Sequence, residues 1–100
     1  MPRTLFAAGR IPARSSVPFA VGSNVPGYLP DAEPHMVKTW EEAKQVLIAD
    51  LLFEADYGPD DEDTASYTRA ADDVAAWTTP TGRVNEISVC GRVYWIETTR

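Results

Sequence analysis

The longest regular pattern of apolar positions lies near the middle of the chain, in residues 39–57. At about 100° of rotation per residue, its large side chains gather on one broad helical face. That face comprises Trp40, Leu47, Ile48, Leu51, Leu52 and Ala55. Thr39 and Glu42 have the spacing of a capping box, and Gly58-Pro59 ends the pattern. The sequence therefore predicts a long helix here, against which the other elements pack.

A second helical pattern follows over residues 63–77. Its apolar face recurs at helical spacing and comprises Tyr67, Ala70, Ala71, Val74 and Trp77. Because most of this face is alanine, the second helix can approach another element closely, with Tyr67 and Trp77 as its large anchors. The segment 79–82, which contains Pro80 and Gly82, ends the helix.

Alternating apolar positions predict a strand over residues 17–22. Pro18 has no amide hydrogen to donate, so we expect this strand to lie at an edge of the sheet or to turn that position outward. Pro26-Gly27 then predicts a type II turn, because proline presets one dihedral angle and glycine accepts a positive φ.

The last part of the chain predicts a β-hairpin. Residues 84–90 and 93–97 are rich in β-branched and aromatic side chains, and Gly91-Arg92 between them suits a type II′ turn. With this turn, Val89 opposes Tyr94 and Ile87 opposes Ile96, and these four side chains face the helices. Ser88 and Trp95 then share the other face.

The predicted order of elements is β-α-α-β-β, which favours an α+β fold with a three-stranded antiparallel sheet and two helices on one face. We expect residues 17–100 to form this single domain, since 100 residues with 44% hydrophobic side chains suit one core. Residues 1–16 carry Arg3, Arg10 and Arg14 and predict a basic, loosely ordered N-terminal arm. A transit peptide and an overlong translation start are alternatives for this arm.

Charge and cysteine content narrow the function classes. The net charge of −6 argues against direct nucleic-acid binding and against an anionic membrane as partner. Cys90 is the only cysteine, which excludes an internal disulfide and suits a reducing compartment. No apolar run approaches the length that crosses a bilayer.

An acidic cluster surrounds the predicted start of the second helix, and it comprises Glu54, Asp56, Asp60, Asp61, Glu62 and Asp63. We interpret it first as a solvated loop and helix cap, since acids suit the start of a helix. A calcium loop does not fit, because Asp61 stands where a sharp turn needs glycine. The alternative is a nucleic-acid mimic, in which the acidic patch 60–63, extended by Asp72 and Asp73, occupies a basic groove.

No constellation for catalysis, metal binding or a cofactor is present in the sequence. His35 lies in a proline-rich segment and Cys90 in the hairpin, so their spacing does not predict a nucleophile and its base. One histidine and one cysteine also do not make a transition-metal site. Phosphate loops, dinucleotide fingerprints and serine elbows are absent from the sequence. We therefore expect a protein that is not an enzyme.

The surplus of aromatic and apolar residues predicts a protein-binding surface. The long helix carries a second stripe of Val46, Ala49 and Phe53, which either lies under the second helix or forms a homodimer seam or a docking groove. Tyr94 and Trp95 point to opposite faces of the sheet, so we expect one ring to be exposed unless the arm covers it. The candidate partner-binding residues are Tyr28, Val46, Phe53 and Trp95.

Two stretches carry a resemblance to a known group of proteins. The run Pro26-Gly27-Tyr28-Leu29-Pro30 before an acidic helix start, Trp77 at the end of the second helix, and Tyr94-Trp95-Ile96-Glu97 in the last strand resemble small accessory proteins of actinobacterial phages. The similarity covers residues 18–97 and leaves out the basic arm. The resemblance implies no enzyme activity and no established role, since such phage proteins often act on host proteins in the host cell cytoplasm or remain unassigned. It carries over no functional residues.

Overall fold

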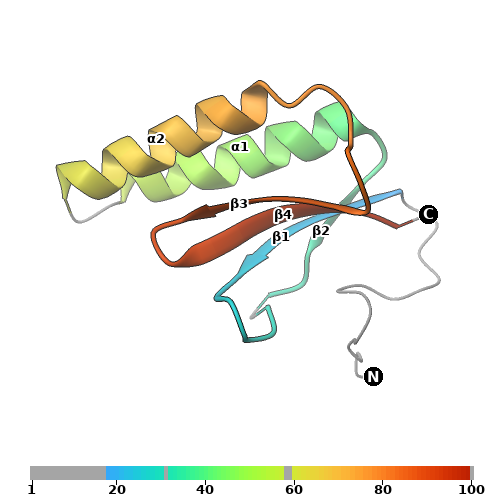
Figure 1. Cartoon of the computed structure of the whole chain (residues 1–100), viewed down its shortest axis with the longest axis horizontal. Coiled ribbons are helices and arrows are strands. Elements are labelled where there is room, and N and C mark those ends of the chain that lie inside the picture. Colours follow the sequence, from blue (N-terminus) through green and yellow to red (C-terminus); the bar gives the residue numbers. More distant parts are fainter. Residues whose placement is uncertain (1–17, 31, 58–59, 100) are drawn as a thin grey trace.

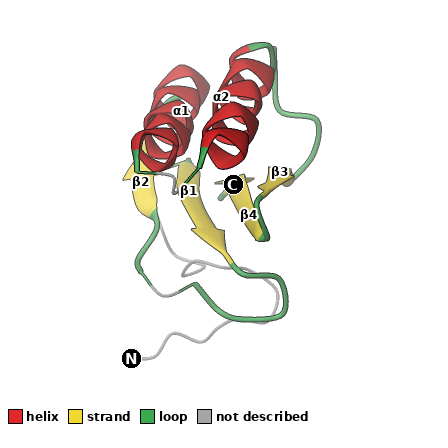
Figure 2. Ribbon diagram, turned by 90° about the vertical axis from the view of Figure 1, so that its left-hand side faces the viewer, coloured by secondary structure: helices red, strands yellow, loops and turns green. Residues whose placement is uncertain are grey.

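The computed structural model describes residues 18–30, 32–57 and 60–99. The elements are β1 (Phe19–Asn24), β2 (His35–Val37), α1 (Trp40–Asp56), α2 (Asp61–Ala75), β3 (Val84–Val89) and β4 (Arg92–Thr98). The strands form one antiparallel sheet in the order β2-β1-β4-β3 (Figure 1). Both helices lie side by side on one face of this sheet (Figure 2). The predicted α+β class is therefore confirmed, whereas the arm predicted for residues 1–16 lies outside the described residues.

The sheet has four strands, so the prediction of three is wrong. The additional strand is β2, which pairs His35 with Val21 and Val37 with Phe19. Three residues directly after Pro34 are too short to show an alternating pattern, and the strand is specified by its pairing with β1.

Strand β2 also places β1 inside the sheet, so the edge position considered for the first strand is wrong. Pro18 precedes the first residue of β1, and its carbonyl accepts a hydrogen bond from the Thr99 amide at 2.7 Å. The missing amide hydrogen of Pro18 therefore leaves the hydrogen-bond ladder of β1 intact.

Helix α1 begins at the predicted capping box. Thr39 Oγ1 accepts a hydrogen bond from the Glu42 amide at 3.0 Å, and Glu42 Oε1 accepts one from the Thr39 amide at 3.2 Å. Leu47, Leu51 and Ala55 are buried, as the helical pattern predicts. Leu52 is exposed, because it lies about 140° around the helix from Leu47 and so outside the face that meets the sheet.

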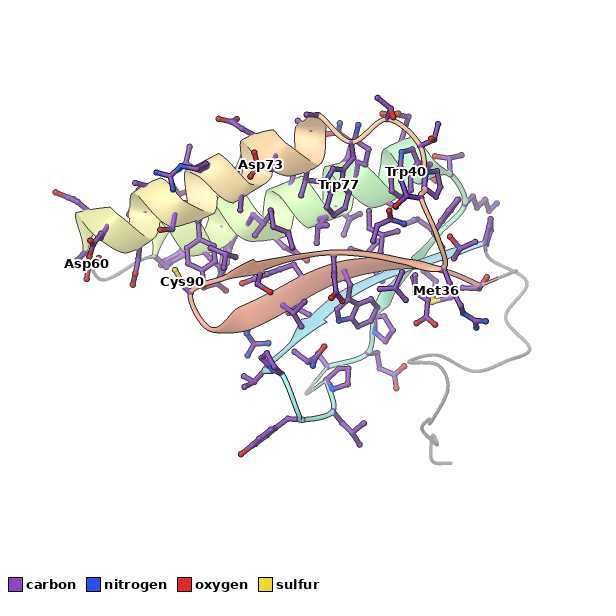
Figure 3. The ribbon with its side chains drawn as sticks, viewed as in Figure 1. Met36, Trp40, Asp60, Asp73, Trp77 and Cys90 are labelled. Atoms are coloured by element: carbon purple, nitrogen blue, oxygen red, sulfur yellow. The ribbon has the colours of Figure 1, made fainter. Side chains whose placement is uncertain are left out.

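Helix α2 begins two residues earlier than expected, because Asp60 caps it by accepting a hydrogen bond from the Asp63 amide at 2.9 Å. The predicted face of Tyr67, Ala70, Ala71 and Val74 is buried. Trp77 lies just beyond the helix end and stacks on Trp40, with ring centroids 6.2 Å apart (Figure 3).

Lys44 joins the two helices and was not singled out by the sequence pattern. Its side chain is buried, and Nζ donates hydrogen bonds to the carbonyls of Ala75 and Trp77 at the end of α2. This cation satisfies terminal carbonyls and complements the negative end of the α2 dipole.

Among the described residues, neither α1 nor α2 combines the length and the apolar character that a membrane span needs.

The hairpin turn lies one residue earlier than predicted. Cys90 (φ 51°) and Gly91 (φ 79°) form the turn, and two positive φ values are typical of type I′ rather than type II′. Val89 therefore pairs with Arg92, and Ile87 with Tyr94. This register differs from the prediction by two residues, which preserves the faces, because side chains alternate with a period of two. Val89, Tyr94 and Ile96 accordingly face the helices as expected.

The sheet has an apolar cluster on each face. The main core lies between the sheet and the helices, where Val21 and Ile96 meet Leu47 and Val74. The second cluster, on the opposite face, comprises Ala20, Val93 and Trp95, with Val84 packed against it.

Candidate functional site

The structure does not bring the four candidate partner-binding residues together. Tyr28 is 70% exposed in the turn after β1. This turn lies below the sheet in Figure 1, on the side away from the helices. Phe53 is 58% exposed on α1, and Val46 is half-buried against the main core. Trp95 is completely buried on the opposite face of the sheet. These residues therefore do not form one surface.

Tyr94 and Trp95 are both buried, so neither ring is exposed. The alternative in which the N-terminal arm covers one of them lies outside the described residues. Gly22 lies directly across from Trp95 in the β1–β4 pair and leaves room for the indole ring. The indole Nε1 donates a hydrogen bond to Asn24 Oδ1 at 2.8 Å, and Asn24 Nδ2 donates to the carbonyls of Val25 and Tyr28, both at 3.0 Å. Trp95 therefore anchors the turn after β1.

That turn has the predicted geometry. Gly27 adopts φ 89°, and the Tyr28 amide donates a hydrogen bond to the Val25 carbonyl at 3.0 Å, as expected for a type II turn. Asn24 is the residue that sequence reasoning missed here, since a buried asparagine reveals its role only once its partners are known.

An exposed aromatic pair lies at the end of α1. Phe53 and Tyr57 are one helical turn apart, with ring centroids separated by 4.6 Å, and Tyr57 is 71% exposed. Helix α2 lies on the Lys44 side of α1, so it does not cover Phe53. The interpretation that α2 covers the Val46, Ala49 and Phe53 stripe is therefore wrong at Phe53. We call Phe53 and Tyr57 the aromatic pair.

A polar pocket of about 340 Å³ opens beside the aromatic pair. It arises where β1 extends beyond the short β2, because β2 pairs only with Phe19, Ala20 and Val21. Residues from both helices and from β1 and β4 line it, namely Ser23, Asp50, Phe53, Glu54, Tyr67, Arg92 and Tyr94. Arg92 Nη1 donates a hydrogen bond to Ser23 Oγ at 3.3 Å, and the rings of Tyr67 and Tyr94 meet edge to face at 6.2 Å.

Burial raises the pKa of three side chains that line this polar pocket, Asp50, Tyr67 and Tyr94. Burial raises the pKa of Asp50, and Glu54 raises it further, while His35 acts in the opposite direction. The pKa of Tyr94 lies far above its usual value, first because of burial and then because of its hydrogen bond with Tyr67. The pKa of Tyr67 is also raised, mainly by burial. Both phenols therefore stay neutral at pH 7 and serve as hydrogen-bonding groups.

The acidic patch has structural roles at two of its four positions. Asp60 caps α2, and Asp63 Oδ1 lies 3.6 Å from the thiol of Cys90, which donates to it. Asp61 and Glu62 are exposed in the first turn of α2. Within residues 18–30, 32–57 and 60–99, no three histidine, cysteine or acidic side chains are grouped so as to hold a metal ion.

His35 and Cys90 belong to opposite edges of the sheet. His35 is the first residue of β2, and Cys90 forms the turn that leads from β3 to β4. Met36, the neighbour of His35, lies at the other end of the molecule from Cys90 (Figure 3). Burial and the Asp63 carboxylate raise the pKa of the Cys90 thiol, which disfavours the thiolate needed for nucleophilic attack.

Comparisons with known proteins give no further assignment. No protein-family model, no curated protein and no solved structure matches this chain. The aromatic pair and the polar pocket therefore have to be interpreted from their own geometry.

Proposed function

We propose that this chain is a non-enzymatic accessory protein of a phage that acts by binding a host protein in the host cell cytoplasm. The resemblance of residues 18–97 to small actinobacteriophage proteins motivates the phage origin and the host partner. The observation that supports a binding role is the aromatic pair, two rings in contact with each other and more than half exposed at the end of α1.

The chemistry of this surface suggests what it would contact. Exposed aromatic side chains on a rigid element are the usual anchors of protein interfaces, because burying them releases much apolar area at a small entropic cost. Glu54 and Asp56 flank the rings on α1, and Asp61 and Glu62 begin α2 nearby in the chain. The proposed partner surface therefore has an apolar pocket with a basic rim.

The test is capture from actinobacterial lysate followed by a measured affinity. The F53A/Y57A variant is expected to bind the captured and purified partner at least about 30-fold more weakly, since interface anchors contribute about 2 kcal/mol or more. The matched control is Y28A, which removes an equally exposed ring from the other side of the sheet. A partner that binds F53A/Y57A as tightly as the unchanged protein, or no enriched partner across several hosts, would contradict the proposal.

The acidic nucleic-acid mimic is the second candidate, and the exposure of Asp61 and Glu62 is the observation that favours it. Its test is competition with DNA for a restriction enzyme or a polymerase. The variant D61N/E62Q neutralises two carboxylates and leaves the Asp60 cap in place. Competition that is lost in D61N/E62Q and kept in F53A/Y57A would support the mimic over protein binding through the aromatic pair.

A further inference from the structure

We propose that a second copy of this chain binds along the free edge of β3, so that two sheets join into one and the two α2 helices lie antiparallel above the junction. This surface lies on the other side of the molecule from the aromatic pair, and the proposal does not depend on the proposed function. It rests on the backbone of β3, on the groove between β3 and α2, and on two charges in that groove.

The edge of β3 offers backbone groups for a further strand. Among the described residues, β3 pairs with β4 alone. In an antiparallel pair, every second residue turns both backbone groups toward its neighbour. The two-residue turn makes Val89 and Arg92 such a hydrogen-bonded pair, and the bond from the Thr98 amide to the Arg83 carbonyl at 2.8 Å fits the same alternation. Glu86 and Ser88 therefore turn their N–H and C=O groups away from β4, toward the free edge.

The residues of β3 select the register of the two copies. The two copies are related by a two-fold axis that crosses the junction of the two β3 strands. If this axis passed at Glu86, the two Glu86 carboxylates would lie directly opposite each other, which is unfavourable. An axis at Ile87 instead pairs Glu86 with Ser88 of the second copy through backbone hydrogen bonds and leaves the Ser88 hydroxyl free to donate to the Glu86 carboxylate. It also brings the two Ile87 side chains together as a non-hydrogen-bonded pair, in which side chains lie closest.

A groove of about 350 Å³ between α2 and β3 receives the second copy. Small side chains of α2, Ser66 and Ala70, line it together with half-buried Ile87. Arg69 and Asp73 line the same groove from the exposed face of α2, where Figure 3 marks Asp73. Ile87 of the second copy fits this groove as an apolar side chain among small ones.

Arg69 and Asp73 identify the occupant as a second copy rather than an unrelated peptide. In the part of the chain that the structure describes, neither side chain has an ion-pair partner. They are one helical turn apart and lie beside Ile87, so a two-fold axis at Ile87 passes between them. Across that axis, Arg69 of each copy meets Asp73 of the other, which makes the surface complementary to itself, as a two-fold interface requires.

Sedimentation equilibrium of the full chain tests the proposal, with S88P as the first variant. Proline removes the outward amide of Ser88 and is tolerated where an edge residue turns its N–H outward. The dissociation constant of the dimer should rise about 30-fold, because each copy loses one hydrogen bond to the other. S88A is the matched reference, since it loses the same hydroxyl as S88P but keeps the amide, and the expected rise is measured against it. Circular dichroism checks that both variants fold.

Charge reversal gives an independent readout. R69D and D73R each place like charges across the axis and should weaken the dimer about tenfold or more, whereas the double variant R69D/D73R restores opposite charges and the affinity. An equimolar mixture of R69D and D73R should assemble as a heterodimer.

Three outcomes would overturn the proposal. The first is a chain that stays monomeric at the highest concentration at which it remains dissolved. The second is a dimer that S88P and the two charge reversals leave unchanged. The third is a dimer that F53A/Y57A abolishes instead, which would place the interface at the aromatic pair.

Discussion

At the scale of single residues, the contact between Gly22 and Trp95 decides how the second face of the sheet is filled. A side-chain carbon at position 22 would lie 2.6 Å from Cη2 of Trp95, well inside van der Waals contact. The indole is also held by its hydrogen bond to Asn24, so it has little freedom to move aside. Position 22 therefore has to be glycine because of its neighbour across the strand pair.

We expect Gly22→Ala to lower the free energy of unfolding by about 1–3 kcal/mol, the cost of overpacking a filled site. The control is Gly82→Ala, where an added carbon meets nothing within 4 Å and the change should stay within about 0.5 kcal/mol. Urea denaturation followed by tryptophan fluorescence measures both. Equal effects of the two substitutions would show that the contact with Trp95 is not the cause.

At the scale of elements, the hairpin turn carries a local conflict between sequence and conformation. A type I′ turn prefers Asn-Gly, yet this chain has Cys90-Gly91, with Cys90 at a positive φ that most residues avoid. The sequence prediction places the turn one residue too late, at Gly91-Arg92, because a type II′ turn prefers glycine in its first position. In the observed turn, β3 pairs with β4 up to Val89 and Arg92, and the Cys90 thiol donates a hydrogen bond to Asp63.

Cys90→Asn should therefore raise the free energy of unfolding by about 1 kcal/mol, because asparagine adopts the left-handed region more readily. Cys90→Ala serves as the comparison, since alanine also lacks the thiol but keeps the conformational cost. Thermal unfolding of the two variants and the unchanged protein provides the measurement. If both substitutions shift the melting temperature equally, the turn conformation does not limit stability.

The elements that sequence reasoning identified are those with local signals. The capping box of Thr39 and Glu42, the spacing of Leu47 and Leu51, and the β-branched and aromatic run of β4 depend on neighbours within a few residues. Strand β2 was missed because only its pairing with β1 reveals it. The polar pocket was missed for the same reason, since Asp50, Tyr67 and Tyr94 come from three different elements that meet only in the folded chain.

At the scale of the whole molecule, Asp50 makes stability depend on pH. Its pKa is raised above the ordinary 3.8, mainly by burial, so the folded state holds the proton more tightly than the unfolded chain does. The stabilisation from this proton is complete below pH 3.8 and is lost as the pH rises through the raised pKa. At neutral pH the ionised carboxylate therefore lowers the free energy of unfolding.

Asp50→Asn should accordingly raise the melting temperature at pH 7 and leave it nearly unchanged at a pH below 3.8, where Asp50 is protonated in both states. Calorimetry at the two pH values measures the difference. A gain that is the same at both pH values would point to packing rather than to the charge.

The pairing of β1 with β4 joins the first described strand to the last, in the middle of the sheet. A ribosome makes the chain from the N-terminus, so β1 emerges with only the three residues of β2 available as a strand partner. The ladder at the centre of the sheet closes only after β4 has been synthesised. Completion of the sheet is therefore expected to wait for β4 and to be governed by contacts of high sequence separation.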